Sequence, residues 1–515
     1  MVQGRTLWEL VERRASETPD ALFVKDEAGR TLTFAGYQQA AERAAAGLAG
    51  MGVGEGTPVS WELPNWLESL VLAGALSRLG AIQNPMLHIY RQREVTFMTR
   101  QTGARLLVVP PVWKGFDYGA MANEVAGDVD GLEVLVIDRS LPEGDPSSLP
   151  PPPAAVEPDE LPIRWRYYSS GTTADPKGIQ HTDATVAAAA RAMADVLAMG
   201  PEDRAALVFP FTHIAGAIFL ISTMERGGAL LAVEAFDPAT TIPWLAREDV
   251  TLAGSVTPMH MAYLAAQRAQ PGTPLFPKVR AFNGGGAPKP PQLHYDLKQE
   301  VGGVGIVSGY GLTECPILTM NTVEDPDEKL AETEGRVTAG VTIRLVDLEG
   351  REVGPGEEGE IRVVGPQLFK GYVDSSLDAD ALDEKGFLKT GDLGKVDDEG
   401  DVTISGRVKD IIIRKGENIS AKEVEDLLYT HPKVADVAVI GLPDPERGER
   451  CCAVVAPADA ADPLGFQEMA DFLREAGLMV QKIPEQLEIV EAVPRNPTGK
   501  ILKHELRDRY AEGAK

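Results

Sequence analysis

Short aliphatic runs alternate with helical patterns through most of the chain, and this alternation restricts the possible fold more than any other feature of the sequence. The runs lie at residues 105–109, 132–137, 205–209, 228–233 and 279–282. Alanine-rich helical patterns precede or separate them at residues 35–49 and 185–199. Strands that alternate with helices are typical of α/β layers in which the sheets are largely parallel. We therefore predict an α/β fold built from layered subdomains.

After about Glu334 the pattern changes. Residues 340–364 predict short antiparallel strands with turns at 348–350 and 354–359, which indicates a β-barrel-like subdomain. Further on, strands near 437–441 and 451–456 belong to a compact α+β tail. We place the domain boundary near Gly406, so that residues 1–406 form a large N-terminal domain and residues 407–515 a small C-terminal domain.

The composition excludes several classes of partner. The chain of 515 residues carries 50 Lys and Arg against 77 Asp and Glu, a formal net charge of −27. A field of that sign repels nucleic acid and anionic lipid, so we expect neither as a partner. Three cysteines without C-x-x-C spacing favour a reducing compartment. A homodimer is one oligomeric state that the sequence allows.

Nothing in the sequence predicts export or a membrane anchor. The N-terminal residues are amphipathic and include acids, unlike a signal or transit peptide. The longest apolar stretch, residues 214–224, is shorter than the ~20 residues that span a bilayer. We expect a cytoplasmic protein without a transmembrane segment.

The most informative segment is YSSGTTADPKG at residues 168–178. It follows a strand-like run, and Lys177 comes before a helical pattern begins. Hydroxyls and exposed backbone N–H groups can surround phosphate oxygens, and a lysine adds positive charge. A Walker loop is excluded, because G-x-x-x-x-G-K-[ST] is absent. Taken alone, the segment favours the interpretation as an ordinary flexible Ser/Thr/Gly loop. Its small residues are Ser169, Ser170, Gly171, Thr172 and Thr173.

Further motifs place this segment in a known pattern. It resembles the phosphate-binding signature of the superfamily of acyl-CoA synthetases, peptide-synthetase adenylation domains and beetle luciferases. The other signatures of that superfamily follow in order: YGLTE at 310–314, TGDL at 390–393, GRVKD at 406–410 with GENIS at 416–420, and PRNPTGK at 494–500. The chain is therefore identified as a member of this superfamily. The resemblance implies an AMP-binding N-terminal domain and a small mobile C-terminal domain.

The implied chemistry explains the residue types. A carboxylate is a poor electrophile, and joining it to AMP with release of pyrophosphate makes it reactive. The first half-reaction is attack of a carboxylate oxygen on the α-phosphorus of ATP, so both partners are anions. Catalysis should then rely on positioning and charge neutralisation. The resemblance implies ATP and CoA as co-substrates and Mg²⁺ as cofactor. Glu314 would help to hold the metal, which prefers carboxylate and phosphate oxygens.

The resemblance also assigns residues to the nucleotide. Lys177 would hold the β- and γ-phosphates with the threonines before it, and Thr313 would contact the α-phosphate. Tyr310 would flank the adenine ring. Asp392 would accept hydrogen bonds from the ribose hydroxyls, with Arg407 near ribose and phosphate. An Asp at a strand end can also cap a turn, and an Arg can simply pair with an acid. The remaining residues assigned to ATP or AMP are Gly284, Gly285, Gly286, Ala287, Pro288, Ser308, Gly309 and Gly311.

Lys500 lies in a Pro/Gly-bounded loop near the C-terminus. A lone lysine there is usually a solvated charge, but within PRNPTGK it resembles the family's catalytic lysine. That lysine neutralises the carboxylate and the α-phosphate, and it acts on the transition state. His213 resembles the aromatic or His position beside the acyl pocket, and a packed core histidine is an equally good interpretation. Cys315 follows Glu314, and we interpret it as a packing residue.

The two half-reactions require different groups around one small site. By resemblance, the C-terminal domain rotates between them about Lys409. The rotation would bring Lys415, Gly416 and Glu417 to the CoA tunnel. A hinge of this kind absorbs its φ/ψ change at one or two residues.

The predicted acyl pocket is mostly apolar, so we expect an uncharged acyl group. Residues 209–216 lack the acid that pairs with an amino-acid ammonium group in adenylation domains. We predict a medium-chain fatty acid or an alicyclic or aromatic acid. Residues 84–90 and 108–118 also resemble ligases for cyclohexane-carboxylate-type acids. The pocket residues are Ile214, Ala215, Gly216, Asn283, Ile317 and Leu318.

The predicted reaction converts acid, ATP and CoA to acyl-CoA, AMP and pyrophosphate through an acyl-adenylate. One alternative is an acyl-AMP ligase that loads an acyl carrier protein instead of CoA. Another is a binding protein that kept the fold without turnover, against which the intact Lys500, Glu314 and Asp392 argue. The sequence does not distinguish CoA from a carrier protein as the acceptor.

Overall fold

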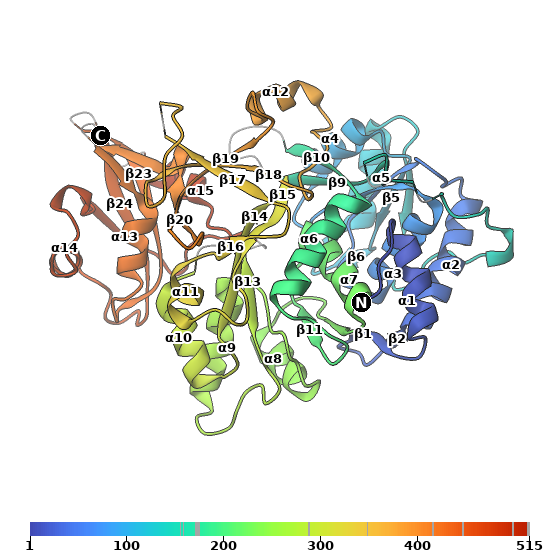
Figure 1. Ribbon diagram of the computed structural model, residues 1–515, viewed down its shortest axis with the longest axis horizontal. Helices are drawn as coiled ribbons and strands as arrows, with labels where there is room; N and C mark the ends of the chain where they lie inside the picture. Colours follow the sequence, from blue (N-terminus) through green and yellow to red (C-terminus); the bar gives the residue numbers. More distant parts are fainter. Residues whose placement is uncertain are drawn as a thin grey trace.

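The structure is a computed structural model that describes residues 1–154, 156–157, 159–169, 176–286, 289–347, 349–414, 417–444, 447–496 and 499–511, without the side chains of Glu417 and Asn418. In Figure 1 the chain runs from N-terminal helices on the right to a C-terminal domain on the left. The sheets that carry the candidate site lie between these two ends.

Two mostly parallel sheets form the first half of the N-terminal region. The larger has the strand order β10-β9-β4-β3-β5-β8, in which β9 and β10 are antiparallel and the other pairs are parallel. The smaller has the order β11-β12-β1-β2, with β1 and β2 antiparallel. These sheets confirm the predicted α/β class.

The strands of the larger sheet are β3 (Pro58–Trp61), β4 (Ile82–Pro85), β5 (Leu106–Val109), β8 (Glu133–Val136), β9 (Ile163–Ser169) and β10 (Lys177–Thr182). Those of the smaller are β1 (Leu22–Asp26), β2 (Thr31–Thr33), β11 (Arg204–Leu207) and β12 (Ala229–Ala232). A short hairpin pairs β6 (Val112–Trp113) with β7 (Phe116–Asp117).

The helices begin and end at residues suited to those positions. Thr33 Oγ1 accepts from Gly36 N at 3.0 Å before α2, and Thr182 Oγ1 accepts from Thr185 N at 3.2 Å before α6. Gly80 ends α3 in the left-handed conformation that glycine adopts without steric cost. The helices of the N-terminal region are α1 (Leu7–Glu17), α2 (Phe34–Gly50), α3 (Leu67–Leu79), α4 (Gln92–Thr102), α5 (Tyr118–Asp128), α6 (Asp183–Val196), α7 (Ile214–Arg226), α8 (Pro238–Arg247), α9 (Thr257–Ala269), α10 (Pro291–Glu300), α11 (Asp327–Glu332) and α12 (Asp378–Ala381).

Two further sheets complete the N-terminal region. The sheet β13-β14-β15-β16 pairs β13 and β14 in parallel and the others antiparallel, and the sheet β17-β18-β19-β20 is antiparallel throughout. The second of these confirms the antiparallel strands predicted within residues 340–364. The strands are β13 (Phe282–Gly285), β14 (Ile306–Leu312), β15 (Cys315–Met320), β16 (Arg336–Val337), β17 (Thr342–Val346), β18 (Gly359–Val364), β19 (Leu388–Val396) and β20 (Val402–Arg407).

The C-terminal part has its own sheet and its own apolar core. Val437, Val455 and Leu473 are fully buried in that core. The chain leaves the fourth sheet at Arg407 and enters the fifth at Ile411, beside the boundary that we propose near Gly406. Its elements are β21 (Ile411–Arg414), β22 (Glu417–Ser420), β23 (Val434–Asp444), β24 (Gly448–Pro457), β25 (Gln486–Ile489), α13 (Ala421–Leu428), α14 (Phe466–Glu475) and α15 (Lys503–Ala511).

Two local expectations differ from the structure. The run at 279–282 predicts a strand, but β13 begins only at Phe282 and continues into the glycine run. Lys177 does not lead directly into a helix, because it opens β10 and α6 starts at Asp183. The segment around Lys177 therefore joins two antiparallel strands.

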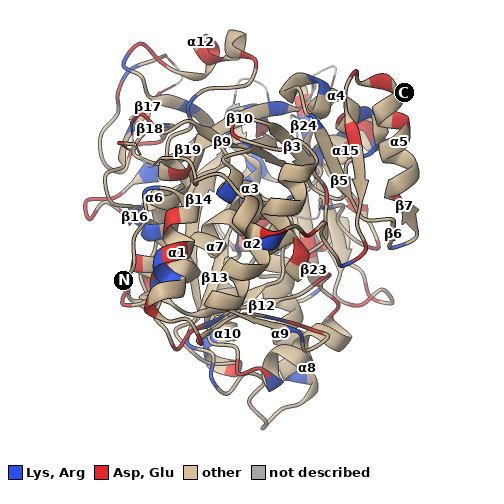
Figure 2. Cartoon of the chain, turned by 90° about the vertical axis from the view of Figure 1, so that its right-hand side faces the viewer, with Lys and Arg blue, Asp and Glu red and all other residues tan. Residues whose placement is uncertain are grey.

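Figure 2 shows Lys and Arg interspersed with Asp and Glu along the outer helices and loops. Across the described residues, no helix combines the length and the apolar character that crossing a membrane requires.

Candidate active site

A buried carboxylate in β19 lies between two partners. Asp392 is 4% exposed. Tyr310 Oη donates to its Oδ2 at 2.7 Å, and Arg407 Nε donates to its Oδ1 at 2.7 Å. Burial and then the charge of Asp392 raise the pKa of Tyr310, so the phenol remains a donor. Burial opposes the charge on Arg407, but Asp392 and Asp410 outweigh it and raise the pKa of Arg407.

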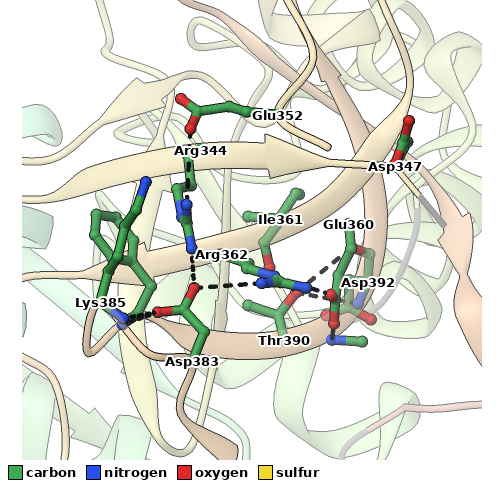
Figure 3. A network of polar contacts seen from close by, with 12 residues as sticks. Arg344, Asp347, Glu352, Glu360, Ile361, Arg362, Asp383, Lys385, Thr390 and Asp392 are labelled. Atoms are coloured by element: carbon green, nitrogen blue, oxygen red, sulfur yellow. Dashed lines mark hydrogen bonds and ion pairs between the residues drawn. The ribbon is translucent and has the colours of Figure 1, made fainter. Parts of the chain in front are cut away.

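A polar network supports the strand segment around Asp392 (Figure 3). Thr390 Oγ1 donates to Ile361 O at 2.7 Å and accepts from Asp392 N at 3.1 Å. To the left in the same view, Arg344 pairs with Asp383. Burial alone would raise the pKa of Asp383, but the bonds from Arg344 and from backbone N–H groups lower it to about 2. Asp392 is thus held by its neighbours in the sheet as well as by its two direct partners.

Thr313 and Glu314 form the turn between β14 and β15. His181 Nε2 lies 2.8 Å from Thr313 O, and His181 Nδ1 lies 2.9 Å from Thr185 Oγ1. Burial lowers the pKa of His181 to about 4, so a neutral ring donates to the carbonyl. Tyr372 Oη donates to Glu314 Oε1 at 2.9 Å. Side chains from two other segments therefore fix this turn.

Lys177 lies beside the same tyrosine. Its Nζ is 5.3 Å from the centroid of the Tyr372 ring, within the range of a cation–π contact. In the β9–β10 pair Lys177 is opposite Ser169. Other residues predicted to contact the nucleotide lie outside the described residues, namely Ser170, Gly171, Thr172, Thr173, Ala287 and Pro288.

The loop that carries Lys500 packs against the N-terminal region. A Cβ atom on Gly499 would lie 3.0 Å from Val256 Cγ2. Within the loop, Lys500 N donates to Asn496 Oδ1 at 2.9 Å. The C-terminal domain therefore contacts the N-terminal region through this loop, at the start of α9.

The Lys500 ammonium group lies within electrostatic range of both carboxylates. Its side chain keeps solvent-accessible surface, yet protein surrounds it on several sides. Desolvation and then the charge of Arg407 lower its pKa, while Asp392 and Glu314 act in the opposite direction. The structure thus brings together the lysine, the two acids and the arginine, which are far apart in sequence.

His213 precedes α7 and lies near Lys500. Its Nδ1 accepts from Ala215 N at 3.2 Å. Desolvation and then the charge of Lys500 lower the pKa of His213 to about 4. His213 also lines a small cavity at the carboxyl ends of β4 and β9, and Ile214 is the one residue of the predicted acyl pocket in that lining. The other lining residues are Pro85, Leu87, Tyr90, Tyr167, Tyr168, Thr212 and Thr313.

Two glycines of the predicted sites allow close backbone packing. A Cβ atom on Gly216 would lie 2.0 Å from Phe211 O, and one on Gly285 would lie 2.8 Å from Gly309 O. Both distances are shorter than a Cβ contact can be. Gly216 therefore permits a tight helix start, and Gly285 permits the pairing of β13 with β14. Room for a bound ligand is not needed to explain either glycine.

Several other predicted residues have partners within the fold. Ser308 Oγ lies 3.3 Å from Thr333 O, and Asn283 O accepts from His260 Nε2 at 3.2 Å. Ile317 adopts a left-handed φ of 52°, which is uncommon for a β-branched residue. The remaining predicted residues lie at the end of β13, within β14 or in the first turn of α7, namely Gly284, Gly286, Gly311 and Ala215.

Leu318 and Cys315 lie in an apolar cluster with Ile179, Val363 and Leu388. Leu318 therefore belongs to the core of this region and not to an open pocket. Burial raises the pKa of the Cys315 thiol to about 12, in agreement with the packing role expected for it.

The predicted hinge lies in a short 3₁₀ turn. Lys409 is the middle residue of Val408–Asp410, and burial followed by the charge of Arg407 lowers its pKa. Asp410 pairs with Arg507 of α15 at 2.7 Å. In the predicted tunnel segment, Lys415 and Gly416 lie outside the described residues, and Glu417 begins β22 opposite Arg414.

Sequence analysis missed His181 and Tyr372, the residues that hold the Thr313–Glu314 turn. Neither lies in a motif that we associated with the site. Tyr372 reaches Glu314 because residues 370–373 add to the edge of β10, where Val373 N donates to Gly178 O at 2.7 Å. A single sequence carries no signal for such an edge pairing.

Comparisons with known proteins identify the family of the chain. Residues 11–373 match the model of the AMP-binding enzyme family, and residues 423–500 match that of the AMP-binding enzyme C-terminal domain. The chain is 30% identical over 508 residues to a medium-chain fatty-acid–CoA ligase of Escherichia coli, covering 96% of this chain and 89% of that protein.

Two further likenesses cover almost the whole chain. It is 32% identical to a salicyl-AMP ligase / salicyl-S-ArCP synthetase of Mycobacterium tuberculosis, covering 97% of this chain and 90% of that protein. The structure of ATP-bound MatB from Rhodopseudomonas palustris superposes with a TM-score of 0.87 at 27% identity, covering 99% of this chain and all of that one. The chain thus belongs to the AMP-binding enzyme family, the adenylate-forming acid ligases.

Proposed function

We propose that the protein is an ATP-dependent carboxylic acid–CoA ligase that works through an acyl-adenylate. The observation that carries the proposal is the convergence of Lys500 from the C-terminal domain with Glu314, Asp392 and Arg407 from the N-terminal region. Joining two anions requires positive charge at the reacting atoms and fixed groups around the nucleotide. This arrangement supplies both.

Asp392 would bind the ribose hydroxyls. Its two oxygens already accept from Tyr310 and Arg407, so the carboxylate is held as an acceptor in a fixed orientation. Tyr310 would flank the adenine ring. Arg407 would lie between the ribose and the phosphates, next to the acid that orients it.

Lys177, Thr313 and Glu314 would serve the phosphates. The carboxylate of Glu314 suits Mg²⁺, a hard cation that takes oxygen ligands. When bound, the metal would neutralise phosphate charge next to the turn. His181 keeps Thr313 in place through the carbonyl contact at 2.8 Å. Thr313 would then face the α-phosphate.

Lys500 would neutralise the carboxylate and the α-phosphate as charge shifts between them. The neighbouring acids favour the charged form of the amine, although desolvation and Arg407 disfavour it. His213 lines the cavity and lies within electrostatic range of Lys500, which suits a group beside the acid's carboxylate. We propose a medium-chain, alicyclic or aromatic acid, because Pro85, Leu87, Ile214 and three tyrosines line the cavity beside two threonines and His213.

A panel of carboxylic acids tests this proposal. Pyrophosphate release should require ATP, Mg²⁺ and an apolar acid, and addition of CoA should give the thioester. If no acid of the panel leads to release of pyrophosphate, the proposal is contradicted.

A second candidate is an acyl-AMP ligase that transfers the acyl group to a carrier protein. The 32% identity to a salicyl-AMP ligase / salicyl-S-ArCP synthetase favours it. The same assay separates the two when free CoA and a phosphopantetheinylated carrier protein are offered side by side. We expect faster transfer to CoA.

A further inference from the structure

We propose that Tyr372 is a positioning residue that fixes the Glu314 carboxylate and the Lys177 ammonium group toward one nucleotide–metal complex. The inference rests on the proposed function and extends it to a residue outside the five motifs. Tyr372 is 4% exposed, so its ring and hydroxyl are held within the protein.

The hydroxyl end of Tyr372 contacts the acid. Tyr372 Oη donates to Glu314 Oε1 at 2.9 Å, a charge-assisted bond in a buried environment. The backbone of Glu314 is fixed as well, because Phe369 N donates to Glu314 O at 2.8 Å. The bond uses Oε1, so Tyr372 fixes one oxygen of the carboxylate and does not occupy Oε2.

The ring of Tyr372 contacts the lysine. Lys177 Nζ lies 5.3 Å from the ring centroid. A ring face attracts a cation without neutralising its charge, so Lys177 remains available to a phosphate. Tyr372 therefore orients both Glu314, an anionic ligand for a metal, and Lys177, a cationic ligand for a phosphate.

The backbone around Tyr372 explains why the two contacts occur together. Ile179 of β10 forms an antiparallel bridge with Tyr372. Gln180 N donates to Gly371 O at 3.1 Å, and Val373 N donates to Gly178 O at 2.7 Å. The segment that carries Tyr372 thus extends β10, whose first residue is Lys177. The sheet sets the spacing between the lysine and the tyrosine.

The test compares Tyr372→Phe, which removes the hydroxyl and keeps the ring, with Tyr372→Leu, which removes both. Tyr37→Phe is the matched control. Tyr37 is fully buried, and its hydroxyl donates to Leu70 O at 2.9 Å within the helical layer of α2 and α3. It reports the loss of a buried tyrosine hydroxyl away from the site.

The first readout is binding of Mn²⁺ with ATP, followed by electron paramagnetic resonance. This readout needs no acid and no turnover. We expect Tyr372→Phe to weaken Mn²⁺–ATP binding about 10-fold, the range for a hydrogen bond to a charged group. Tyr372→Leu should weaken it further, and Tyr37→Phe should leave it unchanged. Equal binding in all four proteins would overturn the inference.

The second readout separates positioning from stability. For Tyr372→Phe the Mg²⁺ concentration needed for half-maximal pyrophosphate release should rise, while thioester formation from presynthesised acyl-AMP should stay at the wild-type rate. In a double-mutant cycle, Tyr372→Phe should add little to Glu314→Gln, because the hydroxyl acts through that acid. Additive losses would contradict the inference. A wild-type protein that binds Mn²⁺–ATP but activates no acid would refute the proposed function alone.

Discussion

The groups at the candidate site come from two regions that are held in different ways. Asp392 and Glu314 of the N-terminal region are 4% and 9% exposed, and each accepts a hydrogen bond from a tyrosine. Lys500 of the C-terminal domain keeps exposed surface, and its backbone is bound to Asn496 of its own loop. The carboxylates are fixed by the sheets, whereas the position of the lysine depends on how the two domains are arranged.

From this difference we expect the two regions to contribute to different steps of the reaction. Fixed groups can serve every step in which the nucleotide stays bound. A group brought in by a second domain can serve one step and leave before the next. Substitutions in the C-terminal domain should therefore affect the two half-reactions unequally, and substitutions of Asp392, which would hold the ribose in both steps, should affect them more evenly.

The largest effect is expected for Lys500→Ala. Pyrophosphate release should fall about 10²–10³-fold, the usual cost of one preorganised charge contact. Thioester formation from presynthesised acyl-AMP should remain largely intact, because the role that we propose for the lysine is confined to the first half-reaction. Lys482→Ala is the control, since Lys482 pairs with Glu423 on the surface of the same domain. Equal losses in both half-reactions would show that the lysine is not specific to one step.

A smaller effect, confined to the other half-reaction, is expected for Lys409→Pro. Proline fixes φ near −65°, which suits the 3₁₀ turn seen here and opposes rotation about this residue. Pyrophosphate should still appear as a single-turnover burst, while CoA-thioester formation from isolated acyl-AMP falls about 10²-fold, a cost of the size that misplaced reacting groups carry.

Lys409→Ala separates the hinge from the charge. It removes the ammonium group and leaves the backbone free to rotate, so both half-reactions should continue. If Lys409→Pro depresses the two half-reactions in parallel, and its melting temperature falls as well, the residue is a strand-end charge and the hinge lies elsewhere.

Sequence patterns predicted the layered fold because periodicity is a local property. The runs at 105–109, 132–137, 205–209 and 228–233 correspond to β5, β8, β11 and β12. The same patterns did not predict the environments of individual residues. Gly216 was assigned to the acyl pocket and Gly285 to the nucleotide site, yet a Cβ atom on either would collide with a backbone oxygen of the protein itself. The collision at Gly285 depends on the pairing of β13 with β14, and the collision at Gly216 depends on the chain reversal before α7.

The site was predictable to a similar degree. The motifs marked Glu314, Asp392, Arg407 and Lys500, which the structure brings together. They gave no sign of Tyr372 or His181, because these residues act through edge pairing and through a contact with a backbone carbonyl. Ordered motifs indicate what touches the substrate, and the tertiary structure is needed to find what holds those groups.

A moderate loss of stability is expected for Gly285→Ala. The added Cβ would lie 2.8 Å from Gly309 O, so β13 and β14 must move apart. We expect about 1–3 kcal/mol of destabilisation, the range for overpacking, with similar losses of activity for short and bulky acids. Gly54→Ala, where a Cβ meets no atom within 4 Å, is the control. A selective loss for bulky acids at an unchanged melting temperature would instead place Gly285 in the acyl pocket.

The smallest effect concerns the pKa of His213, which reports whether the lysine lies near the fixed region in solution. Burial and then the charge of Lys500 hold the pKa of His213 at about 4. Lys500→Met removes that charge and should raise the pKa of His213 by a fraction of a unit, since burial remains. His181, also with a pKa of about 4, is lowered by burial and by Lys370 and should not move. Histidine ¹³Cε1 resonances, followed between pH 4 and 7, measure both rings in one sample. Both pKa values lie below the ordinary 6.5 of an unfolded chain, so the unfolded chain binds more protons than the folded one below that pH. The free energy of unfolding should therefore fall as the pH drops from about 6.5 toward 4. An unchanged His213 resonance in folded Lys500→Met would mean that the C-terminal domain holds its lysine away from the N-terminal sheets.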